Sequence, residues 1–217
     1  AMDRFGTSVD INASGNRIVV GAPFNNANGY ADCGGVRSYE WNGSNWIKMG
    51  SDLDGEATGD QFGRSVSING AGDRIAIGAQ DANDNGSNSG QVKIYDWTGT
   101  QWVQNGSNIE GPAPDNHFGY SVSMDYQGLK VLCGAYGNSS DKGTSRLYEL
   151  IGSNWVQTSY DINGEATGDR SGLAVALSSL GRQCAIGAYH NDGAGTNSGH
   201  VRIFDYTPSG TSSWTQV

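Results

Sequence analysis

The sequence feature that most restricts the fold of this chain is a motif that occurs four times. In each copy a starting residue followed by Gly lies 16 positions before a Gly-Ala pair. The copies start at Phe5, Phe62, Phe118 and Ser171, which are 57, 56 and 53 residues apart. The hexapeptide GEATGD occurs at 55–60 and again at 164–169, two repeats later. A period of about 50 residues predicts an array of similar structural units.

Each repeat contains four short runs with the composition of β-strands, which in the second repeat read FGRSVSI, RIAIGA, VKIYDW and WVQ. They are rich in Val, Ile, Tyr and Trp, and Gly, Asn and Asp separate them. No window has the 3.6-residue apolar period of a helix, and the 34 glycines disfavour helix further. We therefore predict an all-β fold, a β-propeller of four four-stranded antiparallel blades, with a solenoid of antiparallel sheets as the alternative.

The paired motif resembles the FG-GAP repeat, the blade of the integrin α-subunit propeller. The first copy, Phe5-Gly6 with Gly21-Ala22-Pro23, has every residue of that pattern. The other copies depart from it at Gln80, Tyr136 and Tyr189, which replace the proline, and at Ser171, which replaces the phenylalanine. The resemblance spans all four units and implies a propeller outside the cell or at the cell surface.

The number of units leaves the closure of the ring open, because the familiar propellers of that family have seven blades. We expect one domain over 1–217, with blades at about 3–59, 60–115, 116–168 and 169–217. Four blades closing a small ring is the expectation, and the alternatives are two chains pairing into an eight-bladed homodimer or an excerpt of a larger propeller. Ala1-Met2 is typical of a vector-derived start, so the chain is expected to be a domain cut from a longer precursor.

Composition excludes several classes of partner. The formal net charge of −9 argues against the phosphate backbone of a nucleic acid as ligand. No apolar run reaches the ~18 residues of a membrane span. The cysteines are odd in number and have no metal spacing; Cys133 and Cys184 are expected as buried thiols, and Cys33, in a Gly-rich loop, as the one open to reaction or pairing.

The longer loops of each repeat are the expected binding region. In an up-and-down blade the turns between the first and second strands are short here, whereas the loops between the second and third strands are long and polar. Those loops share one face with the connectors between repeats. We predict ligand contacts there from Phe24, Tyr30, Asn83, Tyr136, Asp141, Tyr189, His190 and Asp192. The alternative for Tyr136 and Tyr189 is packing between blades.

Calcium is the one cofactor that the sequence raises. Asp81, Asn83 and Asn85 offer oxygen ligands at alternate positions, and FG-GAP blades often carry calcium loops. Those loops normally lie between the first and second strands, where this chain has only tight turns. Turn formation by Asx side chains is the alternative for these residues, as it is for Asp60 and Asp169 in the GEATGD connectors.

The repeat and its loops predict a function without catalysis. The three histidines lie at unrelated repeat positions, and no motif of a hydrolase or a phosphate-binding loop is present. We predict an extracellular adhesion or binding module that contacts a protein or glycan through the loop face. A multivalent lectin with one sugar pocket per blade and a structural or oligomerisation domain of a larger surface protein are the alternatives.

Overall fold

In the computed structural model, which describes residues 2–207 and 213–217, the chain forms four antiparallel sheets, here called blades 1 to 4. Blade 1 holds β1 (Ser8–Ile11), β2 (Arg17–Ala22), β3 (Gly35–Trp41), β4 (Trp46–Lys48) and β5 (Leu53–Asp54). Blade 2 holds β6 (Phe62–Ile68), β7 (Arg74–Ala79), β8 (Gln91–Trp97), β9 (Trp102–Gln104) and β10 (Ile109–Glu110). Blade 3 holds β11 (Phe118–Met124), β12 (Lys130–Ala135), β13 (Thr144–Ile151), β14 (Asn154–Gln157) and β15 (Ile162–Asn163). Blade 4 holds β16 (Ala174–Leu177), β17 (Gln183–Ala188), β18 (His200–Thr207) and β19 (Ser213–Gln216).

The order of strands within each blade is that of an antiparallel meander, which confirms the all-β, four-bladed prediction. In blades 1 to 3 the outer strand is split, a detail the sequence pattern missed. In blade 1, for example, β4 and β5 both pair with β3, at Tyr39–Trp41 and at Gly35–Val36. Ala1, part of the predicted vector-derived start, and residues 208–212 of the predicted fourth blade lie outside the described residues.

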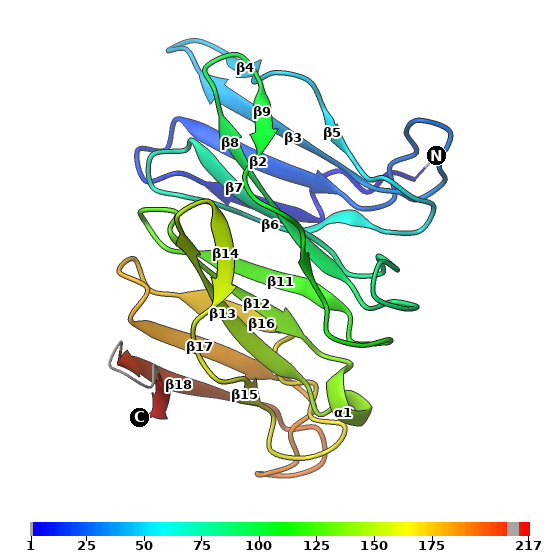
Figure 1. Ribbon diagram of the computed structural model, residues 1–217, viewed down its shortest axis with the longest axis vertical. Coiled ribbons are helices and arrows are strands. Elements are labelled where there is room, and N and C mark those ends of the chain that lie inside the picture. Colours follow the sequence, from blue (N-terminus) through cyan, green and yellow to red (C-terminus); the bar gives the residue numbers. More distant parts are fainter. Residues whose placement is uncertain (1, 208–212) are drawn as a thin grey trace.

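The blades stack in sequence order and do not close a ring. Blade 1 lies at one end of the stack and blade 4 at the other (Figure 1). The arrangement therefore fits a four-bladed, propeller-like fold that is open between its first and last blades. The described residues contain one helix, the single-turn α1 (Asn138–Asp141). No helix in that part of the chain has the length and apolar character needed to cross a membrane.

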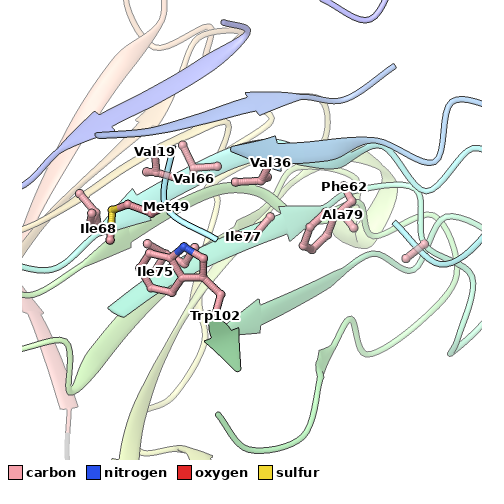
Figure 2. Close-up of a cluster of buried hydrophobic side chains, with 11 residues drawn as sticks. Val19, Val36, Met49, Phe62, Val66, Ile68, Ile75, Ile77, Ala79 and Trp102 are labelled. Atoms are coloured by element: carbon pink, nitrogen blue, oxygen red, sulfur yellow. The ribbon is translucent and has the colours of Figure 1, made fainter. Parts of the chain in front are cut away.

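The core of the molecule lies between successive blades. Figure 2 shows the cluster between blades 1 and 2, where Val19, Val36 and Met49 of blade 1 meet a set of side chains from blade 2. Phe62, Val66 and Ile68 of the β6 strand point into this cluster. Equivalent clusters lie between blades 2 and 3 and between blades 3 and 4. Each sheet thus covers its apolar faces with its neighbours, as a stacked repeat must.

The recurring glycines are required because adjacent blades touch through their backbones. A Cβ added to Gly78 of β7 would overlap the carbonyl oxygen of Gly119 in blade 3. The same overlap would occur at Gly21 with Gly63 and at Gly134 with Gly172. The glycine of each of these Gly-Ala pairs therefore packs directly on the backbone of the glycine at the start of the next repeat. This contact explains the fixed spacing between the two glycine motifs.

In blades 2 to 4 a tryptophan of the outer strand hydrogen-bonds to the preceding blade. The indole Nε1 of Trp102 donates to Ser38 Oγ of blade 1 at 2.7 Å, and that of Trp155 donates to Asn105 O of blade 2 at 3.2 Å. Trp214 Nε1 donates to Ser159 Oγ of blade 3 at 3.0 Å. Trp46, in blade 1, has no preceding blade in this chain and is exposed.

The structure corrects the prediction for Cys33. Its side chain is buried like those of Cys133 and Cys184, and all three are free thiols. The loop that carries Cys33 folds under the connector, where Gly55 packs directly on the Cys33 carbonyl. Burial, not the Gly-rich sequence around it, therefore decides its access to reagents.

Candidate functional site

The long loops and the connectors gather on one side of the stack, here called the loop face. It consists of the loops 23–34, 80–90, 136–143 and 189–199 and the connectors 55–61, 111–117 and 164–170. Figure 1 shows this side as the one where α1 lies. An antiparallel meander places alternate turns at opposite ends of the sheet, so every blade contributes its long loop to the same face.

The two GEATGD connectors form the same turn. Asp60 Oδ2 accepts a hydrogen bond from Ala57 N–H at 3.0 Å, and Asp169 Oδ2 accepts one from Ala166 N–H at 2.9 Å. Both carboxylates are buried. This confirms the turn interpretation for the two aspartates and explains why the hexapeptide is written twice.

The pKa values of the two aspartates nevertheless move in opposite directions. Burial raises the pKa of Asp60 to about 6, and the negative charge of Asp84 adds to this, while the Ala57 N–H opposes it. Burial also acts to raise the pKa of Asp169, but the Ala166 N–H and the Asn191 side chain outweigh it, so its pKa is lowered. Asn191 Nδ2 donates to Asp169 Oδ2 at 3.0 Å. The difference therefore comes from the surroundings of each carboxylate: Asp84 and Glu56 act against the charge of Asp60, whereas Asn191 and the Glu165 N–H stabilise that of Asp169.

We expect Asp60→Asn to stabilise the protein at neutral pH. Because the folded-state pKa of Asp60 is raised, its contribution to stability is greatest at acidic pH and declines as pH rises toward 6. Above that pH the buried charge is a cost of on the order of 1–2 kcal/mol, which the amide removes. Melting temperatures measured at pH 4.5 and pH 8 should show a gain only at pH 8.

Asp169→Asn is the matched control, with the opposite sign. Its lowered pKa means that the carboxylate stabilises the fold above the ordinary Asp pKa and loses this as pH falls. The substitution should therefore lower the melting temperature at pH 8. Equal effects of the two substitutions would contradict the assigned environments.

Tyr136 is the centre of an aromatic and charged cluster on the loop face. Its ring stacks on His117, with centroids 4.7 Å apart and planes 5° apart, and Tyr120 meets it edge-on at 4.9 Å. The guanidinium of Arg170 lies 5.6 Å from the ring centroid. Burial raises the pKa of the Tyr136 hydroxyl. Tyr136 therefore packs between the connectors that flank blade 3.

Two carboxylates bind His117 and Arg170 of this cluster. Asp81 Oδ1 lies 2.8 Å from His117 Nδ1, and Asp141 Oδ2 lies 2.9 Å from Arg170 Nη2. The structure thus joins three predicted residues, Asp81, Tyr136 and Asp141, through His117 and Arg170, which the sequence analysis did not select. The available signal was their position: each directly precedes a repeat start.

The other predicted ligand residues lie on separate blades. On blade 4, Tyr189 is 54% exposed and its ring meets that of His190 at 3.9 Å. On blade 1, Phe24 lies under the Arg4 guanidinium at 4.3 Å, and Tyr30 is exposed. The side chains of Asn83 and Asp192 accept hydrogen bonds from backbone N–H groups of their own loops, from Asn88 at 2.9 Å and from Asn197 at 2.7 Å.

The side chains of Asp81, Asn83 and Asn85 all make hydrogen bonds within the chain. The Asp81 carboxylate is bonded to His117 and Gln61, and the Asn83 oxygen accepts from Asn88. Asn85 Nδ2 donates to Gly111 O at 2.8 Å. No three His, Cys, Asp or Glu side chains within 2–207 and 213–217 are grouped to hold a metal. Calcium at these residues stays a prediction from the sequence.

A check on calcium needs only melting temperatures with added calcium chloride or with a chelator. A bound ion stabilises the folded state by mass action, so a rise with calcium that Asp81→Asn abolishes would support a site. Given the contacts of Asp81, we expect the two melting temperatures to coincide.

An open apolar groove lies at the end of the stack, on blade 4. It has a volume of about 540 Å³, and its lining includes Ala174, Gly187, Tyr189, Gly199 and Val201. Tyr120 of the aromatic cluster closes one side. The groove therefore adjoins the loop face but belongs to the outward side of the last blade.

A comparison with known families places one of the repeats. Residues 53–95, which include β6, β7 and most of β8, match the family model described as FG-GAP repeat. No protein in the curated set matches the chain. The match confirms the family resemblance on the second unit, whose motif begins at Phe62.

Proposed function

From the FG-GAP repeat that residues 53–95 form, we propose that this propeller-type module is a non-catalytic binding or adhesion module acting outside the cell or at its surface, and that its loop face holds a protein partner. The proposal draws on the general use of such repeats in extracellular binding. It assigns the contact to the loops because they are long, polar and differ from blade to blade, whereas the opposite turns are short.

The observation that carries this proposal is a group of crowded carboxylates on the loop face of blade 2. The pKa of Glu110 is raised by burial and by the charge of Asp84, which also acts on Asp60. Glu56 stands beside them, is largely exposed, and pairs with Lys93 at 2.6 Å. Carboxylates that raise one another's pKa create a local negative potential, which favours a basic partner surface.

The loops that carry these charges are held by internal hydrogen bonds. Asn85 Nδ2 binds the Gly111 carbonyl of the adjacent connector, and Asn88 Nδ2 binds Asp115 Oδ1 at 3.1 Å. A partner would therefore meet a surface already in its bound shape, which lowers the entropy cost of binding.

A lectin is the second candidate, supported by the exposed Tyr189–His190 pair. Tyr136 holds the same position in blade 3, but its ring is less accessible than that of Tyr189 because His117 stacks on one of its faces. This difference favours a single aromatic site on blade 4 over one pocket in every blade.

The experiment measures retention of purified secreted proteins of known charge on the immobilised chain, together with a glycan array. Binding of basic proteins that weakens with salt and is lost in Glu56→Gln/Asp84→Asn/Glu110→Gln supports the proposal. Asp73→Asn, an exposed carboxylate on the opposite turns, is the matched control and should bind normally. Binding that ignores the triple substitution, or that goes only to glycans and requires Tyr189, overturns it.

A further inference from the structure

The two ends of the stack expose apolar side chains whose counterparts in blades 2 and 3 are buried. On the outward side of blade 1, here called the leading face, Phe5 is 48% and Val9 67% exposed. Their counterparts in blade 3, Phe118 and Val122, are 0% and 8% exposed. Ile11 of blade 1 is exposed in the same way.

The outward side of blade 4, here called the trailing face, shows the complementary half of the same pattern. Val201 and Ile203 of β18 are 65% and 49% exposed. The matching residues of blade 2, Val92 and Ile94, are 0% and 1% exposed, because blade 3 covers them. The leading and trailing faces are therefore the two different sides of one type of blade–blade contact. The chain forms this contact three times between its own blades.

The backbone at both ends already has the shape of the internal contacts. The residue before each repeat start has a positive φ: 52° at Arg4, 55° at Gln61, 52° at His117 and 54° at Arg170. The residue that faces it on the preceding blade does too: 50° at Asp32, 51° at Asn88 and 62° at Asp141. Asn197 of blade 4 is the next member of that series, with φ 51°.

These backbone shapes serve a repeated pair of hydrogen bonds. Between blades 2 and 3, His117 N–H donates to Asn88 O at 3.0 Å and Phe118 N–H donates to Ser89 O at 3.1 Å. Between blades 3 and 4, Arg170 N–H donates to Asp141 O at 2.8 Å. By the same alignment the Arg4 and Phe5 N–H groups match the carbonyls of Asn197 and Ser198, which accept no backbone hydrogen bond within the described chain.

The groove on blade 4 lies at the position where, in blade 1, the Phe-Gly pair that starts the next repeat packs. In blade 1, Gly21, Gly34 and Val36 contact the Phe62-Gly63 backbone directly. Gly187, Gly199 and Val201 are their counterparts and line the open groove. A Cβ on Gly187 would meet nothing nearer than Ala174 Cβ at 3.5 Å, because no following blade is present. Phe5-Gly6, with Gly6 at φ 95°, has the conformation of the missing occupant.

We propose that the trailing face of one copy of this chain receives the leading face of a second copy, with Phe5-Gly6 in the groove at Gly187 and Gly199. Because the two faces are unlike, the contact is head-to-tail, and two copies form it twice when they close a ring. Such a ring has eight blades, within the range of known propellers, whereas three copies would exceed it. The pairing does not depend on the partner proposed for the loop face.

The contact between chains is expected to be weaker than the internal contacts, because blade 4 lacks serine hydroxyls that the internal blades have. Internal blades carry hydroxyls at the strand facing the next blade, so that Ser65 Oγ donates to Gly119 O at 2.8 Å and Ser67 Oγ accepts from Met124 N–H at 3.1 Å. Ala174 and Ala176 replace these serines in blade 4. The contact between chains rests on apolar packing and backbone hydrogen bonds alone, and we expect it to dissociate on dilution while the internal contacts hold.

The test is the molar mass of the purified chain by light scattering over a wide range of concentration. We expect twice 22.8 kDa at high concentration. Gly187→Ala and Val201→Glu should each give the monomer mass with an unchanged circular dichroism spectrum. Ile151→Glu, an exposed isoleucine of blade 3 away from both faces, is the matched control and should remain dimeric.

A rescue variant keeps the test specific to these faces. Val66 and Val36, the internal counterparts of Val9 and Val201, lie in one cluster (Figure 2), so Val9→Lys with Val201→Glu should restore the dimer that either substitution alone removes. A monomer at all concentrations, a dimer that survives Gly187→Ala and Val201→Glu, or a mass that grows beyond two chains would overturn the proposal.

Discussion

Gly78→Ala should destabilise the folded chain by about 3 kcal/mol or more, which is a large part of the stability of a domain. Gly78 lies in β7 where the backbone of Gly119 crosses from blade 3, and the added Cβ would overlap the Gly119 carbonyl oxygen. The obstacle is backbone, so no side-chain rotation relieves it, and blades 2 and 3 would have to separate. Urea unfolding of the variant should show a lower midpoint at an unchanged slope.

The matched control uses the same residue type at the same place in the motif. Gly187→Ala adds a Cβ that reaches only Ala174, at ordinary contact distance, so we expect a change within about 0.5 kcal/mol. Both variants are measured at concentrations where the chain is monomeric. A similar loss at Gly187 would show that the glycine is needed for strand geometry and not for contact between blades.

Phe118→Ala is expected to cost about 3–5 kcal/mol, because it empties a site between two blades. Phe118 is fully buried, and its ring meets the edge of Tyr148 with centroids 6.0 Å apart. It also pairs through its backbone with Gly90 of blade 2. Chemical unfolding monitored by circular dichroism measures the loss.

Phe5→Ala removes the same side chain from the same motif position in blade 1. Because Phe5 is half exposed and has no blade in front of it, the monomer should lose less than about 1 kcal/mol. If both phenylalanines contributed equally, burial between blades would not be the source of their effect.

The repeat made the architecture predictable because its motif records contacts between blades. The valine and the residue two positions after it in FGxSVxI alternate with polar residues, and Val66 and Ile68 indeed enter the core. Asp60 could be assigned to a turn from its place three residues after Ala57 in a connector. These patterns link residues that are close in the sequence and recur with little change in the repeats. They can therefore be recognised without knowing how the whole molecule is arranged.

The residues of the loop-face cluster were less predictable, because they occupy the same position in each repeat but differ in chemical type. Gln61, His117 and Arg170 all precede a repeat start with positive φ, yet one is an amide, one an imidazole and one a guanidinium. The carboxylate partners of His117 and Arg170, which are Asp81 and Asp141, come from the loop of the preceding blade. Closure of the ring was equally out of reach, since it depends on the angle between sheets, which no residue encodes alone.

The indole bonds that cross from each outer strand to the preceding blade imply that cohesion in this molecule is passed from neighbour to neighbour. In the monomeric chain a middle blade has a neighbour on both sides, whereas a terminal blade has one on a single side. Amide hydrogens of β7 and β12 should therefore outlast those of β1 and β19 in deuterium exchange, and opening should travel inward from the ends in the manner of a one-dimensional lattice.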